Sequence, residues 1–251
     1  MKDIFILPSL QELYSRPYDQ SMKELRRLGA IDKAARILDL MSRNDAEKVG
    51  QVLEVGCGTG DVMRELARRG FGQDISGFEI GSELSQQQSE KIKGRSVAIE
   101  GYDGQTLPFT AGSFDFVYAT HVLEHVLHER EFLYELRRVS KGFVYVEVPL
   151  ELLARTRISN LQNSLSLAGH IKAYSLESFL LKLETSGLKV LHHQLYDHSP
   201  EIFAFQNGSI VAKVKRRVRG LALKFVPGLA QRLFTYHCGA LYTAAVKMNI
   251  C

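Results

Sequence analysis

The chain has 251 residues, 45% of them apolar, which is enough for the core of one α/β domain and leaves two smaller domains as the alternative. Its three cysteines are widely spaced and form no cluster with histidines at zinc spacing, so we expect neither a disulfide framework nor a zinc finger. No apolar run reaches 18 residues, and the one at the N-terminus ends after four, so we expect a cytoplasmic protein without a spanning helix or a leader.

Helices and strands alternate through most of the chain. Residues 8–47 have a helical, mostly polar pattern, with apolar positions at Leu25, Leu28, Ile31, Ala35 and Leu38. Beyond them we predict strands at 51–55, 74–80, 96–101, 113–120 and 143–149, and helices at 61–70, 82–94 and 129–142, each helix ending at a glycine. This alternation indicates βαβ units and a mainly parallel sheet, which binds ligands at the carboxyl ends of its strands.

The last third of the chain is less regular. A loop at 150–173 is followed by a predicted helix at 175–187 and a strand at 188–197. The closing strand is either 201–207 or 240–249, and we favour the second, which makes 209–236 an inserted helical element. The predicted units are therefore a helical cap (1–47), a core (48–208), the insert (209–236) and a closing segment (237–251), with the cap and the insert covering the acceptor as a lid.

Three glycines follow the first strand at alternate positions, in the stretch QVLEVGCGTG at 51–60. No Lys follows them as a P-loop requires, and Asp61 occupies the third glycine position of a dinucleotide fingerprint. A tight turn without ligand is one alternative. The other is a nucleoside-like ligand, which Glu79 favours because an acid at the end of the second strand accepts hydrogen bonds from ribose hydroxyls.

The stretches VLEVGCGTG, GFEI, YDGQTLPF, SFDFVYATHVLEHV, GFVYVEVP and GHIKAYSLESFLLKLETSGLKV occur in this order between residues 52 and 190. Together they resemble the class I S-adenosylmethionine-dependent methyltransferases, in the branch with an LEH motif after the fourth strand. The resemblance implies an α/β, Rossmann-like, doubly wound sheet of seven strands. It also implies S-adenosylmethionine as cofactor and S-adenosylhomocysteine as product.

The resemblance assigns the cofactor contacts by position. The methionine and ribose part would lie against the glycine loop, the ribose against the end of the second strand, the adenine beside residues 102–109, and the methyl group beside the end of the fourth strand. The implied cofactor-binding residues are Glu54, Gly56, Cys57, Gly58, Gly60, Glu79, Ile80, Asp103, Gly104 and Thr120. Tyr102 departs from the small residue that many relatives have before the acid.

Methyl transfer needs a base only when the acceptor still holds its proton. The candidates after the fourth strand are His121, Glu124 and His125, and His170 lies on the loop after the fifth strand. The alternative is that these side chains only stabilise the fold and take no part in the reaction. We expect no metal, because no cluster of Asp and Asn is visible, and no adenine methylation of DNA, because ATHV replaces the NPPY-type motif.

The net charge of +4 is unevenly placed. The segment 213–224 has six basic residues and no acid, so the rest of the chain has a net charge of −2. On a helix, the apolar residues Ile210, Val214, Val218, Leu221 and Phe225 share one face. The segment is either a solvated cover or a surface for an anionic membrane, an anionic substrate or RNA, and the lack of interleaved aromatic residues argues against RNA.

The sequence thus predicts transfer of a methyl group to a small-molecule, sugar-linked or lipid-linked acceptor, with oxygen as the expected atom. We also expect peripheral contact with an anionic membrane through 210–225. We do not expect nucleic acid as a partner. The alternatives are a non-catalytic scaffold that keeps the cofactor fold and an RNA or protein methyltransferase. The oligomeric state stays open.

Overall fold

The computed structural model describes residues 19–44, 49–80, 88–102, 104, 106–206 and 209–243. Within these residues one sheet of eight strands has the order β3-β4-β2-β1-β5-β6-β8-β7. The strands are β1 (Gln51–Val55), β2 (Asp74–Glu79), β3 (Gln88–Ile92), β4 (Arg95–Gly101), β5 (Phe114–Thr120), β6 (Ser140–Pro149), β7 (Val190–Tyr196) and β8 (His237–Thr243). Strands β4, β2, β1, β5 and β6 are parallel neighbours, whereas β3 and β8 are antiparallel to theirs.

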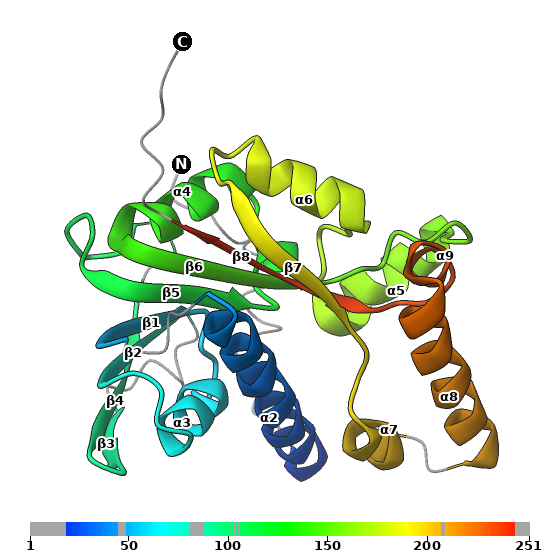
Figure 1. Cartoon of the computed structure of the whole chain (residues 1–251), viewed down its shortest axis with the longest axis horizontal. Coiled ribbons are helices and arrows are strands. Elements are labelled where there is room, and N and C mark those ends of the chain that lie inside the picture. Colours follow the sequence, from blue (N-terminus) through cyan, green and yellow to red (C-terminus); the bar gives the residue numbers. More distant parts are fainter. Residues whose placement is uncertain are drawn as a thin grey trace.

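Helices cover both faces of this sheet (Figure 1). The helices are α2 (Gln20–Ser42), α3 (Asp61–Arg68), α4 (Glu129–Val139), α5 (Ile158–Ala168), α6 (Leu176–Glu184), α7 (Pro200–Gln206), α8 (Ile210–Phe225) and α9 (Pro227–Leu233), with a short 3₁₀ turn η1 (Leu123–His125). In Figure 1, α2 and α3 lie below the sheet and α4 and α6 lie above it. This is the doubly wound arrangement that the alternating pattern predicts, with one strand more than the seven expected.

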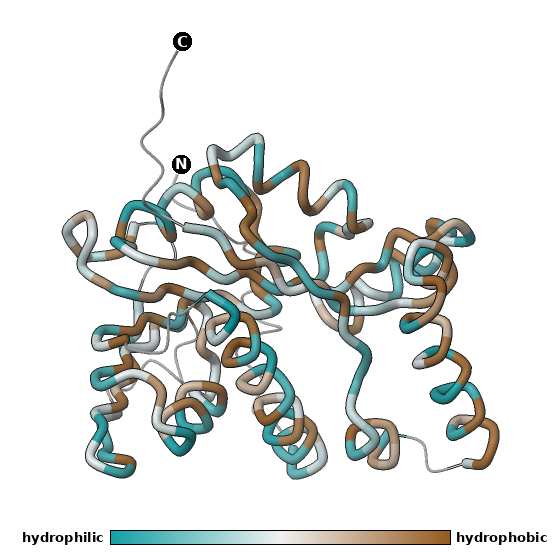
Figure 2. Tube along the Cα trace, viewed as in Figure 1, coloured by the Kyte–Doolittle hydropathy of each residue, from teal (hydrophilic) through white to brown (hydrophobic). Residues whose placement is uncertain are grey.

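Alternate residues of each central strand enter two separate cores. Phe116 and Tyr118 of β5 pack with the buried side of α2 and α3, whereas Val117 and Ala119 pack with α4 and α6. Because both faces are covered, the central strands are nearly continuous apolar runs. Figure 2 shows these runs as brown segments in the middle of the sheet.

The segment 82–94 was predicted as a helix, and this is wrong for its described part. Residues 88–92 form strand β3, which pairs with β4 through a hairpin from Ile92 to Arg95. Lys93 and Gly94 both have positive φ, +49° and +80°, as a two-residue hairpin turn requires. Gly94, interpreted as a helix stop, is therefore the turn residue of a hairpin.

The helix at 129–142 is also shorter than predicted. It ends at Val139, and β6 begins at Ser140. Gly142 does not end the helix but lies within β6, where a Cβ would collide with the backbone carbonyl oxygen of Asp115. Close approach of β6 to the irregular start of β5 is the reason for this glycine.

The C-terminal third differs from prediction in three places. The segment 201–207, a candidate strand, is helical in α7, which begins at Pro200 as helices often do. The closing strand β8 covers 237–243 rather than 240–249, and residues 244–249 lie outside the described part. The loop predicted at 150–173 contains the helix α5.

The long N-terminal helix buries a different face from the predicted one. Residues Ala30, Ala34, Ile37, Leu40 and Met41 are buried, whereas Ala35 is exposed. The smaller side chains of Ala30 and Ala34 let α2 approach the sheet and α3 closely. This approach places the polar residues of α2 above the carboxyl ends of the strands.

Candidate active site

The glycine loop connects β1 to α3. Gly56, Gly58 and Gly60 have φ values of +75°, +53° and +76°, which other residues rarely adopt. The amides of Gly56 and Cys57 donate to the carbonyl oxygen of Phe78, at 2.7 and 3.1 Å, and so tie the loop to β2. A Cβ would meet Val122 at Gly56, the Arg26 guanidinium at Gly58 and Ile99 at Gly60. Positive φ and packing against these side chains therefore both require glycine.

Glu79, the last residue of β2, faces this loop. Its Oε2 accepts from the amide of Gly58 at 2.6 Å, and its Oε1 accepts from the amide of Ile80 at 2.9 Å. The carboxylate is thereby held in one orientation at the wall of a cavity that the glycines also line. A fixed acceptor beside a glycine loop fits the ribose hydroxyls of a nucleoside.

Glu54 lies one layer deeper. It is 1% exposed and accepts from the hydroxyl of Tyr118 at 2.9 Å. Burial raises the pKa of Glu54 to about 8, although the Tyr118 hydrogen bond lowers it. This carboxyl group supports the floor of the cavity below the glycine loop.

The expected adenine side is described in part. Asp103 lies outside the described residues. Gly104 has a φ of +74°, and a Cβ there would lie 3.1 Å from Ile80. Tyr102 lines the cavity and packs edge-on against Phe78, with ring centroids 5.7 Å apart.

The cavity has a volume of about 670 Å³ and runs between α2 and the carboxyl ends of the strands. Helix α2 lines it with Arg26, Gly29, Lys33 and Arg36. The lining residues beyond the cap come from the core and from α7 and β8, and none comes from 209–236, all of which the structure describes. The insert thus does not cover this cavity as the predicted lid.

The end of the cavity away from Glu79 is rich in histidine. Five histidines line it: His121, His125, His170, His198 and His237. Thr120, at the end of β5, also lines the cavity and is 6% exposed. The structure thus brings the predicted His121, His125 and His170 together, although His170 is distant in sequence.

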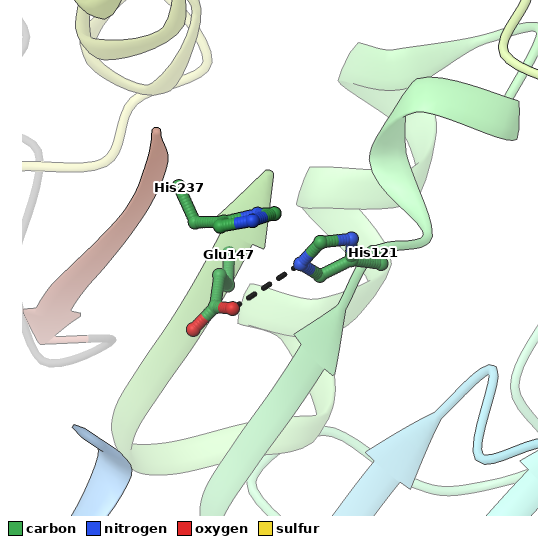
Figure 3. A group of neighbouring side chains, drawn as sticks. All are labelled: His121, Glu147 and His237. Carbon is green, nitrogen blue, oxygen red and sulfur yellow. Dashed lines mark hydrogen bonds and ion pairs between the residues drawn. The ribbon is translucent and has the colours of Figure 1, made fainter. Parts of the chain in front are cut away.

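His121 immediately follows β5 and has a φ of +58°, an uncommon conformation for a residue with a side chain. Its amide donates to the carbonyl oxygen of Glu147, and its Nε2 donates to the Glu147 Oε1 at 3.2 Å (Figure 3). Burial and, to a smaller extent, the charge of Lys33 lower the pKa of His121 to about 3, although Glu147 raises it. The ring is therefore neutral, and its Nδ1 carries the lone pair.

Glu147 is fully buried in β6 and is compensated by several donors. Arg36 of α2 donates to its Oε1 at 2.8 Å, and the Tyr145 hydroxyl donates to its Oε2 at 2.5 Å. Burial raises the pKa of Glu147, but Arg36 and His121 outweigh burial and hold it well below the usual range. An ionised Glu147 therefore connects the cap helix to the histidine end of the cavity.

His198 and His237 were not identified from the sequence, nor were Lys33 and Arg36. The Nε2 atoms of the two histidines lie 3.3 Å apart, and Figure 3 shows His237 beside Glu147 and His121. His198 follows β7 and His237 begins β8, in the least regular third of the chain. The only sequence feature that could have identified these two histidines was their position next to the end of a predicted strand.

A doubly wound sheet with a glycine loop after β1 and an acid at the end of β2 defines an α/β protein that binds a nucleoside-containing ligand. A family model described as a methyltransferase domain matches residues 22–193. The chain belongs to this family, that of the class I S-adenosylmethionine-dependent methyltransferases. Its cofactor is S-adenosylmethionine, which the glycine loop and Glu79 fit as described.

Curated relatives match parts of the chain. It is 27% identical over 126 residues to the chloroplastic tocopherol O-methyltransferase of Arabidopsis thaliana, covering 49% of this chain and 36% of the relative. It is 26% identical over 178 residues to a sterol 24-C-methyltransferase of Gibberella zeae, covering 66% of this chain and 47% of the relative. The matches thus span between a third and a half of these relatives' length.

Solved structures share the fold. A phospholethanolamine N-methyltransferase 2 of Haemonchus contortus, in complex with phosphomonomethylethanolamine and S-adenosylhomocysteine, has a TM-score of 0.59 at 13% identity, covering 94% of this chain and 61% of that one. The [4+2]-cyclase SpnF has a TM-score of 0.55 at 18% identity, covering 83% and 79%. Among the described residues, no helix has the length and apolar character needed to span a membrane.

Proposed function

We propose that this methyltransferase transfers the methyl group of S-adenosylmethionine to an oxygen of a small-molecule, sugar-linked or lipid-linked acceptor. The observation that carries the proposal is the continuous cavity between Glu79 and the five histidines. One end fits the nucleoside, and the other offers imidazole nitrogens where an acceptor would lie. A hydroxyl group has a proton to lose, and a neutral imidazole can accept it, although burial lowers the pKa of His121 and His125 and so weakens them as bases.

Holding the cofactor and the acceptor close together supplies much of the remaining rate enhancement. The sulfonium of the cofactor is an activated leaving group, so positioning and exclusion of water account for much of the rate. We assign the cofactor to Glu54, Glu79 and the glycine loop, and the acceptor to the segment around Thr120. The acceptor-side residues are His121, Glu124, His125 and His170. Helix α2 covers the reaction from the solvent side.

The named relatives support an acceptor of low molecular weight. Their names give tocopherol and a sterol as substrates, both lipid-soluble molecules, and the methylated atoms are oxygen in one and carbon in the other. We therefore include lipid-linked acceptors, and we propose that α8 lies against an anionic membrane. Its apolar face is exposed, with Ile210 at 79% and Phe225 at 69%. Lys213, Lys215, Arg217 and Lys224 are exposed on the same helix, whereas Arg219 turns inward to Asp197.

The test is a methyl-transfer assay with the purified protein, S-adenosylmethionine and a panel of phenols, hydroxylated lipids, sugar-linked alcohols and amines. We expect S-adenosylhomocysteine to form with one or more hydroxylated compounds and the product to carry an O-methyl group by mass spectrometry. Methylation of amines or carbon alone would contradict the choice of oxygen. Tight cofactor binding without turnover on any compound would favour the second candidate, a protein that uses the fold for other chemistry, as the name of the SpnF cyclase illustrates.

A further inference from the structure

Glu124 has no hydrogen-bond donor on its side chain, although it is fully buried. Both carboxylate oxygens lack a partner, and the residue is 0% exposed. An uncompensated buried carboxylate is costly, so either a proton or a cation must offset its charge. The nitrogens of the neighbouring side chains determine what can bind beside it.

Three imidazole nitrogens surround the Glu124 Oε1. The Nδ1 of His121 lies 3.6 Å away, and the Nε2 atoms of His125 and His170 each lie 4.0 Å away. The three ligand atoms of Glu124, His125 and His170 are all within 4.8 Å of one another.

The tautomer of each ring is set by its other nitrogen. The His125 Nδ1 donates to the carbonyl oxygen of Gly169 at 3.1 Å, and the His170 Nδ1 donates to the Glu151 Oε2 at 2.9 Å. The His121 Nε2 donates to Glu147. In the neutral rings, the nitrogens that face Glu124 therefore all carry lone pairs. They cannot donate to an ionised carboxylate, but they can bind a cation or accept the proton of a protonated Glu124, and a metal titration distinguishes these two cases.

We propose that Glu124, His125 and His170 bind one divalent transition-metal ion, such as Zn²⁺, at the acceptor end of the cavity, with one coordination position left open towards the cavity. Two imidazoles and one carboxylate are a ligand set for Zn²⁺, Fe²⁺, Co²⁺ or Ni²⁺ rather than for Mg²⁺ or Ca²⁺. Ligand atoms around tetrahedral Zn²⁺ lie about 3.3 Å apart, given bonds of about 2.0 Å. The ligand atoms of Glu124, His125 and His170 lie within 4.8 Å of one another, so these side chains must move closer together by up to about 1.5 Å.

The supporting residues hold this arrangement in place. The amides of Ile171 and Lys172 donate to the carbonyl oxygen of Glu124, which fixes the 169–172 loop on η1. The Ser164 hydroxyl donates to the second oxygen of Glu151 at 2.9 Å, and so orients the carboxylate that holds His170. Such carboxylate–histidine pairs are typical of metal ligands.

A second cluster in Figure 3 (His121, Glu147 and His237) is a weaker candidate. There the carboxylate is already paired with Arg36 at 2.8 Å, and a dication bound to it would lie beside a buried guanidinium. Glu124 has no such pair. His121 faces both carboxylates, with Nε2 towards Glu147 and Nδ1 towards Glu124, and the lone pair is on the Glu124 side.

The role of the ion rests on the proposed function. His125 and His170 line the cavity, so an ion between them and Glu124 faces the acceptor. A metal in this position binds an acceptor oxygen and lowers the pKa of its hydroxyl group. It thereby makes proton loss easier, which methylation at oxygen requires.

The first test is a calorimetric titration of the protein with Zn²⁺, after dialysis against a chelator and then metal-free buffer. We expect one Zn²⁺ per chain, a Co²⁺ form with visible absorption bands, and no competition from Mg²⁺. Glu124→Gln and His170→Ala are expected to weaken Zn²⁺ binding at least about tenfold, and Glu151→Gln about 10- to 100-fold as the loss of a positioning residue.

Two histidine variants are the controls. His193→Ala changes an exposed histidine of β7 and is expected to leave Zn²⁺ affinity unchanged, as is His237→Ala. Absence of stoichiometric Zn²⁺ binding, or equal affinity in Glu124→Gln and the unchanged protein, would overturn the proposal. Loss of binding in His237→Ala but not in His170→Ala would assign the ion to the other cluster and also overturn it.

Binding of S-adenosylhomocysteine is measured in the same samples. A protein that binds this product but no metal retains its cofactor site, so only the metal proposal fails. A protein that binds Zn²⁺ but not the product would instead count against the proposed function. Thermal unfolding of each variant shows whether the chain is folded.

Discussion

At the scale of single residues, the best-defined contact of the cofactor end is the carboxylate of Glu79. Two backbone amides, those of Gly58 and Ile80, hold it at 2.6 and 2.9 Å. Because this charged acceptor is already held in one orientation, its side chain loses little conformational entropy when a ribose binds. The contribution of this one side chain to cofactor affinity is therefore measurable.

We expect Glu79→Gln to weaken binding of S-adenosylhomocysteine by about 1.5–3 kcal/mol, because hydrogen bonds to a charged acceptor have this value. Calorimetric titration measures the change. Glu184→Gln, an exposed acid at the end of α6, is the matched control and should bind as the unchanged protein does. Unchanged affinity in Glu79→Gln would remove Glu79 from the cofactor site.

A second residue-scale prediction concerns Glu129, which is 8% exposed and accepts hydrogen bonds from Lys172, Tyr174 and Lys182. Burial raises the pKa of Glu129, but these three donors outweigh burial, and the net pKa is lowered. A lowered pKa in the folded state means that the ionised carboxylate stabilises the fold above the unfolded-state pKa of about 4.3, and that this contribution is lost as the pH falls through the folded-state value.

Glu129→Gln should therefore reduce the free energy of unfolding by about 1–3 kcal/mol at pH 7. The difference from the unchanged protein should narrow below about pH 4. Urea denaturation of the two proteins at pH 7 and below about pH 4 measures this difference in the free energy of unfolding. A difference of equal size at the two pH values would show that the charge of Glu129 does not stabilise the fold.

At the scale of elements, two glycines have opposite roles. Gly142 lies in β6, where a Cβ would meet the carbonyl oxygen of Asp115, whereas Gly220 lies inside α8 with nothing within 4 Å of its Cβ position. Gly142→Ala should destabilise the protein by about 1–3 kcal/mol through overpacking. Gly220→Ala should stabilise it by about 0.5–1 kcal/mol, because alanine is the better helix former. Chemical denaturation measures both, and shifts of the same sign would contradict the packing argument.

The other element-scale prediction concerns α8, in which brown and teal residues alternate along the helix (Figure 2). Its apolar residues are exposed and its charges are basic, which suits an interface with anionic lipid. We expect the protein to sediment with vesicles that contain phosphatidylserine and to release them as salt rises, since each basic residue contributes about 1 kcal/mol at low ionic strength.

The paired change Leu221→Ser and Phe225→Ser should weaken this vesicle binding. Ile158→Ser, which removes an exposed apolar side chain of α5, is the control and should not. Binding that survives the α8 changes, or that needs no anionic lipid, would exclude the proposed membrane surface.

At the scale of the whole molecule, the cavity is closed by segments that are far apart in the chain. Helix α2 lies over the strand ends and contacts both α3 and α7, so the N-terminal helix, the core and the C-terminal third meet around one cavity. A ligand bound there stabilises all of them together, because it binds the folded chain and not the unfolded one.

We therefore expect S-adenosylhomocysteine at 100 times its dissociation constant to add about 2.7 kcal/mol to the free energy of unfolding. Thermal or chemical unfolding with and without the ligand measures this, and NAD is the negative control. Stabilisation by NAD and not by S-adenosylhomocysteine would contradict the assignment of the cofactor site.

Local patterns determined much of this protein. The strands at 51–55 and 114–120 are mostly apolar, and 74–79 alternates between apolar and polar residues. The glycine loop follows the first strand and Glu79 ends the second, so their place at the strand ends follows from the sequence. The helix α3 and the hydrophobic side of α4 follow from periodicity. These features depend on neighbours within about ten residues of the chain, and a sequence displays such neighbours directly.

The tertiary structure alone decided the rest. Gly94 and Gly142 are both glycines after helix-like patterns, yet one forms a hairpin turn and the other admits a neighbouring strand, because only the partner strand distinguishes these uses. In the same way, Arg36 faces Glu147, and the unpaired carboxylate of Glu124 faces His170, across long separations in the sequence. Burial and the direction of a lone pair come from packing, so the sequence could name several of the histidines but not what surrounds them.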